Sequence, residues 1–201
     1  MAESGLHLLG VIGGESGPLS PDALDAELIR HGSLAALVRA VTLPLPTAEV
    51  DAVAVQAHHH TLDMVMRQLS VVPMPWGVVF SGPAEVTSFL QHQQAALAEA
   101  LTLVEDHWEF RLHIDSMESG GERIVPTDIA TKLYSELRRM ARAAVPIPVE
   151  DARRFSAAFL VQRGRSRSFM DRLEELGGLH PAISLDLTGP WPPYDFVRVT
   201  P

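Results

Sequence analysis

Three consecutive histidines, His58, His59 and His60, are the first residues in this sequence whose type suggests chemistry. They lie in a segment whose apolar residues recur at helical spacing. Neighbouring side chains on a helix project about 100° apart, so three in a row cannot converge on one metal ion. His59 and Asp63 share a face at positions i and i+4, which is only half of a ligand set. The sequence therefore predicts no metal site here, and it predicts that the histidines lie on a polar helix face.

A second polar set follows from strict alternation between residues 107 and 114. Trp108, Phe110, Leu112 and Ile114 share one face, and the opposite face carries His107, Glu109, Arg111 and His113. This pattern predicts a strand with one buried and one wet face. Catalysis on the polar face would need a nucleophile, and the sequence has no G-x-S-x-G elbow. A solvated or interdomain face is therefore expected, and the alternative is a cleft in a small-molecule-binding or enzymatic α+β domain.

The compact basic cluster of the chain is Arg163, Arg165 and Arg167, interleaved with Gly164 and Ser166. It precedes a predicted helix, where cations are mildly unfavourable. We expect a solvated turn, with docking to a carboxylate of a partner or of the acidic half of the chain as the alternative. The glycines after the first strand lack the spacing and the Gly-Lys-Ser/Thr of a phosphate loop. The chain has no cysteine, which excludes thiol catalysis and Cys-ligated zinc. These observations predict a protein that is not an enzyme and needs no cofactor.

Strands and helices alternate in the segments that would position these residues. Strands are expected at residues 6–12, 34–41, 71–80, 108–114, 155–162 and 183–187, and helices at 22–31, 48–69, 83–103, 127–144 and 168–176. The wet-faced strand and the early succession of strands favour the α+β class. We expect a ferredoxin-like antiparallel sheet subdomain in residues 1–118. A smaller α+β subdomain with a Pro/Trp-rich C-terminal tail is expected in residues 119–201.

Charge supports this division. Residues 1–118 carry a net charge of −11 and residues 119–201 carry +2, and Ser, Gly and Glu cluster at residues 116–121. The acidic first half repels nucleic acid and anionic membranes, so neither is an expected partner. The N-terminus lacks the basic region of a signal peptide, and the longest apolar run is too short to cross a bilayer. A cytoplasmic protein is therefore expected.

The segment Thr-Gly-Pro-Trp-Pro-Pro-Tyr-Asp-Phe-Val, residues 188–197, has three prolines in four positions. Prolines fix φ and remove backbone donors, so a stiff polyproline II spacer is expected, with Trp191 and Tyr194 on one side. Two interpretations follow: a tail pinned by its aromatic side chains, or an aromatic surface for a partner. We expect Trp191 to be buried against the second subdomain, with Tyr194 or Phe196 more available for contact.

This tail resembles the C-terminal signature of the gas vesicle GvpL/GvpF family. The strand Leu-His-Leu-Leu-Gly-Val-Ile at residues 6–12 is similar to the opening strand of that family, and Val-Pro-Met-Pro-Trp-Gly-Val-Val-Phe at residues 72–80 resembles its middle block. The segments around Trp108 and at residues 155–161 also resemble family strands. Two residues depart from the pattern: Pro75 replaces the usual arginine, and Glu109 replaces the glycine that follows the tryptophan.

The resemblance implies an accessory protein that helps to assemble the gas vesicle shell, located in the cytoplasm or on the vesicles themselves. Its implied partners are the shell protein and sister accessory proteins. The residues expected to contact them are four aromatic residues and the basic cluster: Trp76, Arg163, Arg165, Arg167, Trp191, Tyr194 and Phe196.

Overall fold

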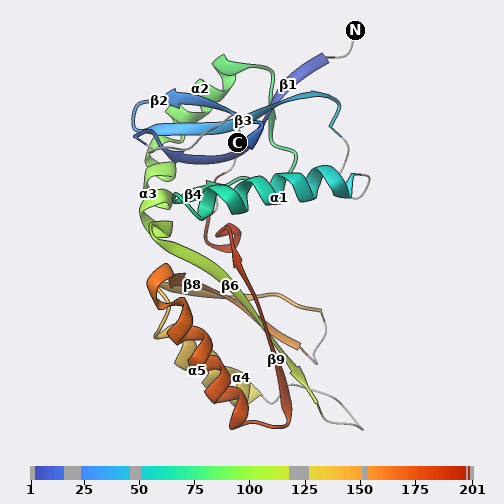
Figure 1. Ribbon diagram of the computed structural model, residues 1–201, viewed down its shortest axis with the longest axis vertical. Coiled ribbons are helices and arrows are strands. Elements are labelled where there is room, and N and C mark those ends of the chain that lie inside the picture. Colours follow the sequence, from blue (N-terminus) through green and yellow to red (C-terminus); the bar gives the residue numbers. More distant parts are fainter. Residues whose placement is uncertain are drawn as a thin grey trace. The chain divides into compact units, whose positions relative to one another are not determined.

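The computed structural model describes residues 3–15, 24–45, 51–117, 127–150, 154–197 and 199 (Figure 1). The chain forms two compact units. Unit 1 comprises Met1–Glu105 with Pro192–Pro201, and unit 2 comprises Asp106–Trp191. These limits differ from the expected boundary at 118/119, because the strand at residues 107–116 pairs with strands that follow it in the sequence. Within the described residues, no helix is long and apolar enough to cross a membrane.

Unit 1 is built on an antiparallel sheet of five strands. The spatial order is β2-β3-β1-β4, and β5 also pairs with β1. The strands are β1 (Glu3–Gly13), β2 (Glu27–His31), β3 (Leu34–Leu43), β4 (Val71–Pro73) and β5 (Val79–Phe80). The central strands β1 and β3 contain runs of Leu, Val and Ala that are buried, as expected for strands covered on both faces.

Helices cover both faces of this sheet (Figure 1). Helices α2 (Pro83–His92) and α3 (Gln94–Val104) contribute Val86, Leu90 and Leu97 to one core, together with Leu8 and Val38 of the sheet. Helix α1 (Ala52–Met66) lies on the other face and buries Leu62, Val65 and Met66. The apolar spacing that predicts a helix over residues 48–69 is therefore confirmed for α1.

Three expectations for unit 1 are wrong. The helix expected at residues 22–31 is not formed where the structure describes it, because residues 27–31 form β2 and turn at Gly32 (φ 56°) to pair with β3. The strand expected at residues 71–80 is interrupted by a turn at Trp76 and Gly77, where Gly77 has φ 95°. The single helix expected at 83–103 is two helices that meet at Gln93.

Unit 2 contains a four-stranded antiparallel sheet in the order β7-β8-β6-β9. Its strands are β6 (His107–Ser116), β7 (Ala143–Ile147), β8 (Arg154–Gln162) and β9 (Ile183–Trp191), and its helices are α4 (Thr127–Arg138) and α5 (Ser166–Gly178). The succession β-α-β-β-α-β with this order is the ferredoxin-like arrangement. It is found here in unit 2, whereas we expected it in residues 1–118. The expected α+β class is confirmed for the chain.

The alternation along β6 correctly predicts the core of unit 2. Phe110, Leu112 and Ile114 are buried with Phe159 of β8 against helices α4 and α5, and the Phe159 and Phe169 rings lie 5.4 Å apart. Strand β7 was not expected, because residues 143 and 144 were assigned to the end of a helix. Helix α4 ends at Arg138, and the Tyr134 hydroxyl donates a hydrogen bond to the Ala144 carbonyl oxygen (3.0 Å).

The C-terminal segment differs from the expected polyproline spacer. Residues up to Trp191 belong to β9, and a 3-10 turn, η3 (Tyr194–Phe196), follows. Pro190 is tolerated because β9 is an edge strand. The expectation that Trp191 is buried is wrong, since its side chain is 44 % exposed. Thr188 lies opposite Arg111 and Trp191 opposite Glu109, so one extra residue in β9 moves Trp191 off the helix-covered face.

Candidate functional site

The residues expected to contact partners fall into two groups, one in each unit. Trp76, Tyr194 and Phe196 belong to unit 1, and each is half-buried. The second group belongs to unit 2: Arg163, Arg165, Arg167 and Trp191. Among the described residues, no group of three or more His, Cys, Asp or Glu side chains could hold a metal ion. The two groups are described separately.

Unit 1 contains a cluster of rings that we call the histidine cluster: His7, His58, His59, Trp76 and Tyr194. His7 comes from β1, the other histidines from α1, Trp76 from the turn between β4 and β5, and Tyr194 from η3. The His7 and His58 rings stack with their centroids 5.0 Å apart. Trp76 meets both edge-on, at 4.7 Å from His7 and 5.8 Å from His58.

Hydrogen bonds fix the orientation of these rings. His58 Nε2 lies 3.0 Å from the Met74 carbonyl oxygen, to which it donates, and the Gly77 N–H donates to His7 Nε2 (3.4 Å). The Tyr194 hydroxyl lies 3.1 Å from His59 Nδ1 and 3.4 Å from His58 Nε2. The tyrosine thereby fastens the C-terminal turn η3 to helix α1.

Burial keeps the two stacked histidines neutral. Desolvation, followed by the positive charge of Arg39, lowers the pKa of His7 to about 4. Desolvation is also the main cause that lowers the pKa of His58 to about 4, with His7, His59 and Arg39 acting in the same direction and the Met74 carbonyl opposing them. Neither ring therefore carries a charge near neutral pH, which permits the close stacking.

The expectation of a polar helix face is wrong for His58, which is fully buried, although His59 and His60 are exposed. Its position explains the burial, because residue 58 precedes Leu62, Val65 and Met66 at helical spacing. That spacing could have identified His58 as part of the apolar stripe. The proximity of His7 could not be read from the sequence, because it depends on how β1 packs against α1.

In unit 2 the polar face of β6 is less exposed to solvent than expected. The Glu109 side chain is fully buried, and its Oε1 accepts a hydrogen bond from Arg111 Nε at 2.8 Å. His113 Nδ1 lies 2.7 Å from Oγ of Ser156, which stands directly opposite on β8. Sequence reasoning missed Ser156, because nothing local to residue 156 marks it as the partner of residue 113.

Ser156, His113 and Asp186 lie in one row across β8, β6 and β9, an order of residue types that suggests a catalytic triad. Two observations argue against that role. The Ser156 side chain is buried (1 % exposed), so its oxygen is closed to a substrate. Among the described residues, Asp186 makes no hydrogen bond to His113, so it does not orient the ring. The row is best explained as a structural hydrogen bond with a neighbouring surface carboxylate.

The basic turn is formed by Arg163–Arg165 and the start of α5. The Arg163 guanidinium lies over the Trp108 ring, 5.6 Å from its centroid, and 3.8 Å from an Asp106 carboxylate oxygen. Burial lowers the pKa of Arg163, and Asp106 opposes that effect. Arg165 is exposed, and Arg167 pairs with Asp171 one turn along the helix (2.9 Å).

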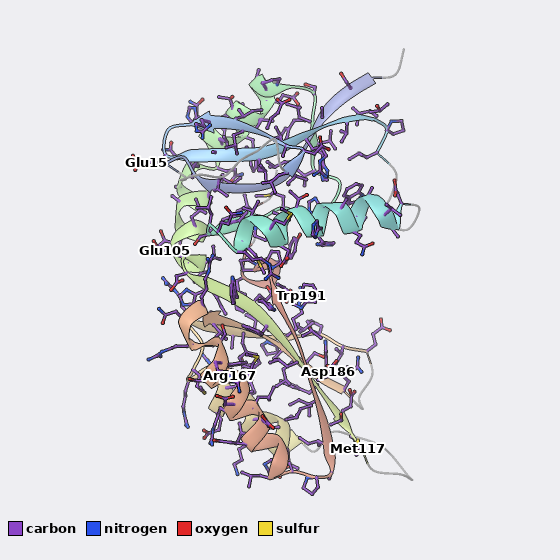
Figure 2. All side chains as sticks on the ribbon, viewed as in Figure 1. Glu15, Glu105, Met117, Arg167, Asp186 and Trp191 are labelled. Atoms are coloured by element: carbon purple, nitrogen blue, oxygen red, sulfur yellow. The ribbon has the colours of Figure 1, made fainter. Side chains whose placement is uncertain are left out.

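Trp191 lies at the same end of the sheet as the basic turn, because His107 pairs with Gln162 and Glu109 pairs with Trp191. Its indole N–H donates to the Thr188 hydroxyl at 3.1 Å, which fixes the ring on the end of β9 (Figure 2). Trp191 and the three arginines therefore share one end of the sheet but not one face, because Trp191 lies on the face that the helices leave uncovered. Exposed tryptophan and arginine are both residue types that are enriched in protein interfaces. We call Trp191 with Arg163, Arg165 and Arg167 the Trp–Arg surface.

Comparison with known proteins gives one consistent result. A family model described as gas vesicle synthesis protein GvpL/GvpF matches residues 14–127 and 125–198. Gas vesicle protein F2 of Halobacterium salinarum is 28 % identical over 211 residues, which cover 99 % of this chain and 94 % of the relative. The crystal structure of the gas vesicle protein GvpF from Anabaena sp. superposes with a TM-score of 0.77 at 16 % identity and covers 98 % of this chain and 97 % of that one. GvpF from Microcystis aeruginosa gives a TM-score of 0.74 at 14 % identity, covering 97 % and 99 %.

Proposed function

Because this chain belongs to the gas vesicle synthesis protein GvpL/GvpF family, we propose that it is a non-enzymatic accessory protein of gas vesicle assembly. In this role it binds the shell protein or sister accessory proteins in the cytoplasm while the shell is built. The observation that carries the proposal is the extent of the family match, which includes both units and all seven residues expected to contact partners.

The Trp–Arg surface is the proposed principal contact. Tryptophan and arginine are the residue types most enriched among those that dominate binding energy in interfaces. The sequence places three arginines within five residues, and the fold adds Trp191 from a different strand at the same end of the sheet. A partner with an apolar patch flanked by carboxylates would complement this surface.

Trp76, Tyr194 and Phe196 remain proposed contacts in unit 1. Trp76 and Tyr194 already take part in the histidine cluster, so only the exposed edges of their rings are available to a partner. We therefore expect each of them to contribute less binding energy than Trp191. Their half-burial has one advantage for binding: side chains that are already ordered lose little conformational entropy in a complex.

The polar face of β6 supports the non-enzymatic interpretation over the enzymatic alternative. Glu109 is paired with Arg111, and His113 is hydrogen-bonded to a buried serine. A general base needs access to a substrate proton and a nucleophile needs access to the substrate itself; burial denies the first to Glu109 and the second to Ser156. The proposed function requires no cofactor, metal ion, nucleic acid or membrane.

The proposal is tested in a host that forms gas vesicles and lacks its own copy of this gene. Expression of the chain is expected to restore buoyant cells, and purified chain is expected to capture the purified shell protein or a purified sister accessory protein. Trp191→Ala should weaken that capture, whereas Met117→Ala, which changes another exposed apolar residue of unit 2, should not. Normal vesicle formation without the gene, together with no capture of any of these proteins, would refute the proposal.

A further inference from the structure

We propose that the outer edge of β9 receives an extended strand of a partner protein, in which apolar residues alternate with lysine or arginine. This inference rests on the proposed function, since it names a surface and a partner chemistry for assembly. It concerns the long edge and the helix-covered face of β9, which are distinct from the Trp–Arg surface at the end of the strand.

The two edges of the sheet in unit 2 differ in how well they are protected. Strand β7 has five residues and contains Pro146, which removes a backbone donor and discourages pairing. Strand β9 has nine residues, and the six from Ile183 to Thr188 include neither proline nor glycine. In the described part of the chain, β9 pairs with β6 on one side only. Its other side therefore presents backbone groups that an added strand could pair with.

An apolar groove runs beside this edge, on the face of the sheet that α4 and α5 cover. Its volume is about 530 Å³, and it is lined by Met170, Leu173, Glu174 and Gly177 of α5 and by Ile183, Leu185 and Leu187 of β9. Met170 is 40 % exposed, and Leu185 and Leu187 of β9 are half-buried. A strand added beside β9 would place every second side chain in this groove. The groove thus requires apolar residues at alternate positions.

Two carboxylates, those of Glu174 and Asp186, define the charge that a partner needs. The nearby Asp171 and Glu175 on α5 are already paired with Arg167 and Arg172. By contrast, Glu174 in the groove and Asp186 on β9 form no ion pair with any described residue. Asp186 alternates with Leu185 and Leu187, so it lies on the opposite face of the strand (Figure 2).

A partner strand therefore needs a lysine or arginine opposite Asp186, on the face away from its apolar residues. Glu174, which lines the groove, adds negative charge that favours a basic partner over an acidic one. A second copy of this chain fits poorly, because it would bring its own Glu174 and Asp186 toward the same carboxylates. The occupant is thus a different protein with a basic amphipathic strand.

The test uses synthetic ten-residue peptides in which valine alternates with lysine, with a valine–glutamate peptide as the charge control. Amide hydrogen exchange, resolved by NMR, is measured for residues 183–188 of the full chain. The valine–lysine peptide is expected to slow exchange at alternate amides of β9, and the valine–glutamate peptide is expected to have no effect. The double variant Glu174→Lys/Asp186→Lys should bind the valine–lysine peptide at least about tenfold more weakly and should bind the valine–glutamate peptide instead. Glu99→Lys, an exposed charge reversal on α3, is the matched control and should behave as the parent chain.

The inference is overturned if no peptide slows exchange in β9 at concentrations up to about 1 mM, where even weak strand addition is detectable. It is also overturned if the double variant binds both peptides as the parent does, or if the peptides protect β2 or β7 instead. Its failure is distinguishable from failure of the proposed function. A chain that restores gas vesicles and captures the shell protein but binds no peptide at β9 would leave the function standing and remove this surface.

Discussion

Trp76 in unit 1 and Trp191 in unit 2 have opposite surroundings. Trp76 follows β4 and packs edge-on against two buried histidines. Trp191 ends β9, is 44 % exposed and makes its hydrogen bond to a neighbour in its own strand. Both were expected from the sequence to contact partners, and each lies in a proline-containing segment. In the folded chain their surroundings differ: Trp76 packs in a cluster of rings, whereas Trp191 is exposed to solvent.

The difference teaches that residue type and motif do not determine whether an aromatic side chain serves stability or binding. Trp76 is held by groups that must remain uncharged, so its environment depends on pH. Trp191 is held by backbone geometry, because a register shift in β9 turns it away from the helices. Each of the following experiments tests one side of this comparison.

The largest expected effect is acid destabilisation of unit 1 through His7 and His58. Unfolded histidine binds a proton below about pH 6.5, whereas both folded rings have a pKa of about 4. Between these values the unfolded state binds more protons, so the free energy of unfolding falls as the pH falls from about 6.5 to about 4. A pKa difference of this size corresponds to roughly 3 kcal/mol for one ring. Urea unfolding at a series of pH values measures the slope.

His58→Gln should flatten that slope, and exposed His60→Gln should leave it unchanged. If both variants keep the slope of the parent chain, other groups cause the acid sensitivity, and the neutral histidine cluster is not what holds Trp76.

A smaller loss is expected from Gly189→Ala, which tests the geometry that displays Trp191. Gly189 has φ 122°, and a Cβ at this position would lie 2.8 Å from the Glu109 carbonyl oxygen and 3.2 Å from the Phe110 ring. The backbone strain and the clash should cost about 2–3 kcal/mol. Differential scanning calorimetry measures the change. The control is Gly178→Ala at the end of α5, where the added Cβ meets nothing within 4 Å and no stability should be lost.

The comparison itself is tested by removing each tryptophan. Trp76→Ala should cost about 2 kcal/mol, because it removes two aromatic contacts from a partly buried site. Trp191→Ala should cost less than about 1 kcal/mol, since much of the ring is already in water. Binding should change in the reverse order, with capture of the shell protein weakened mainly by Trp191→Ala. Equal stability losses would mean that Trp191 is also a structural residue.

The α+β class and most elements could be predicted, because their patterns are local. The alternation along β6, the helical spacing of α1 and the apolar run of β8 each identify an element within about ten residues. Strand β2 and strand β7 could not be predicted in the same way. Both are short, and each owes its conformation to pairing with β3 or β8.

The candidate site was less predictable than the fold, for two physical reasons. His7 and His58 are 51 positions apart and meet only because β1 packs against α1, so the sequence contains no spacing that marks them as a pair. The direction of Trp191 depends on a single extra residue in β9, and one residue inverts every side chain that follows. The arginines of the basic turn were found because they lie within one short segment.

The smallest expected effect follows cleavage of the chain between β6 and α4: the two fragments should stay together. This experiment tests whether β6, and with it the boundary between the units of the two tryptophans, is assigned correctly. The charge break and the sequence Ser-Gly-Gly-Glu-Arg predict limited tryptic cleavage after Arg123. The resulting fragments should not separate in native size-exclusion chromatography. Strand β6 is on the first fragment, whereas both of its partners, β8 and β9, are on the second. The second fragment also carries Tyr194, which bonds to His59 on the first. Urea should be needed to part them, and fragments that separate in buffer would place the boundary at 118/119 and assign β6 to the first unit.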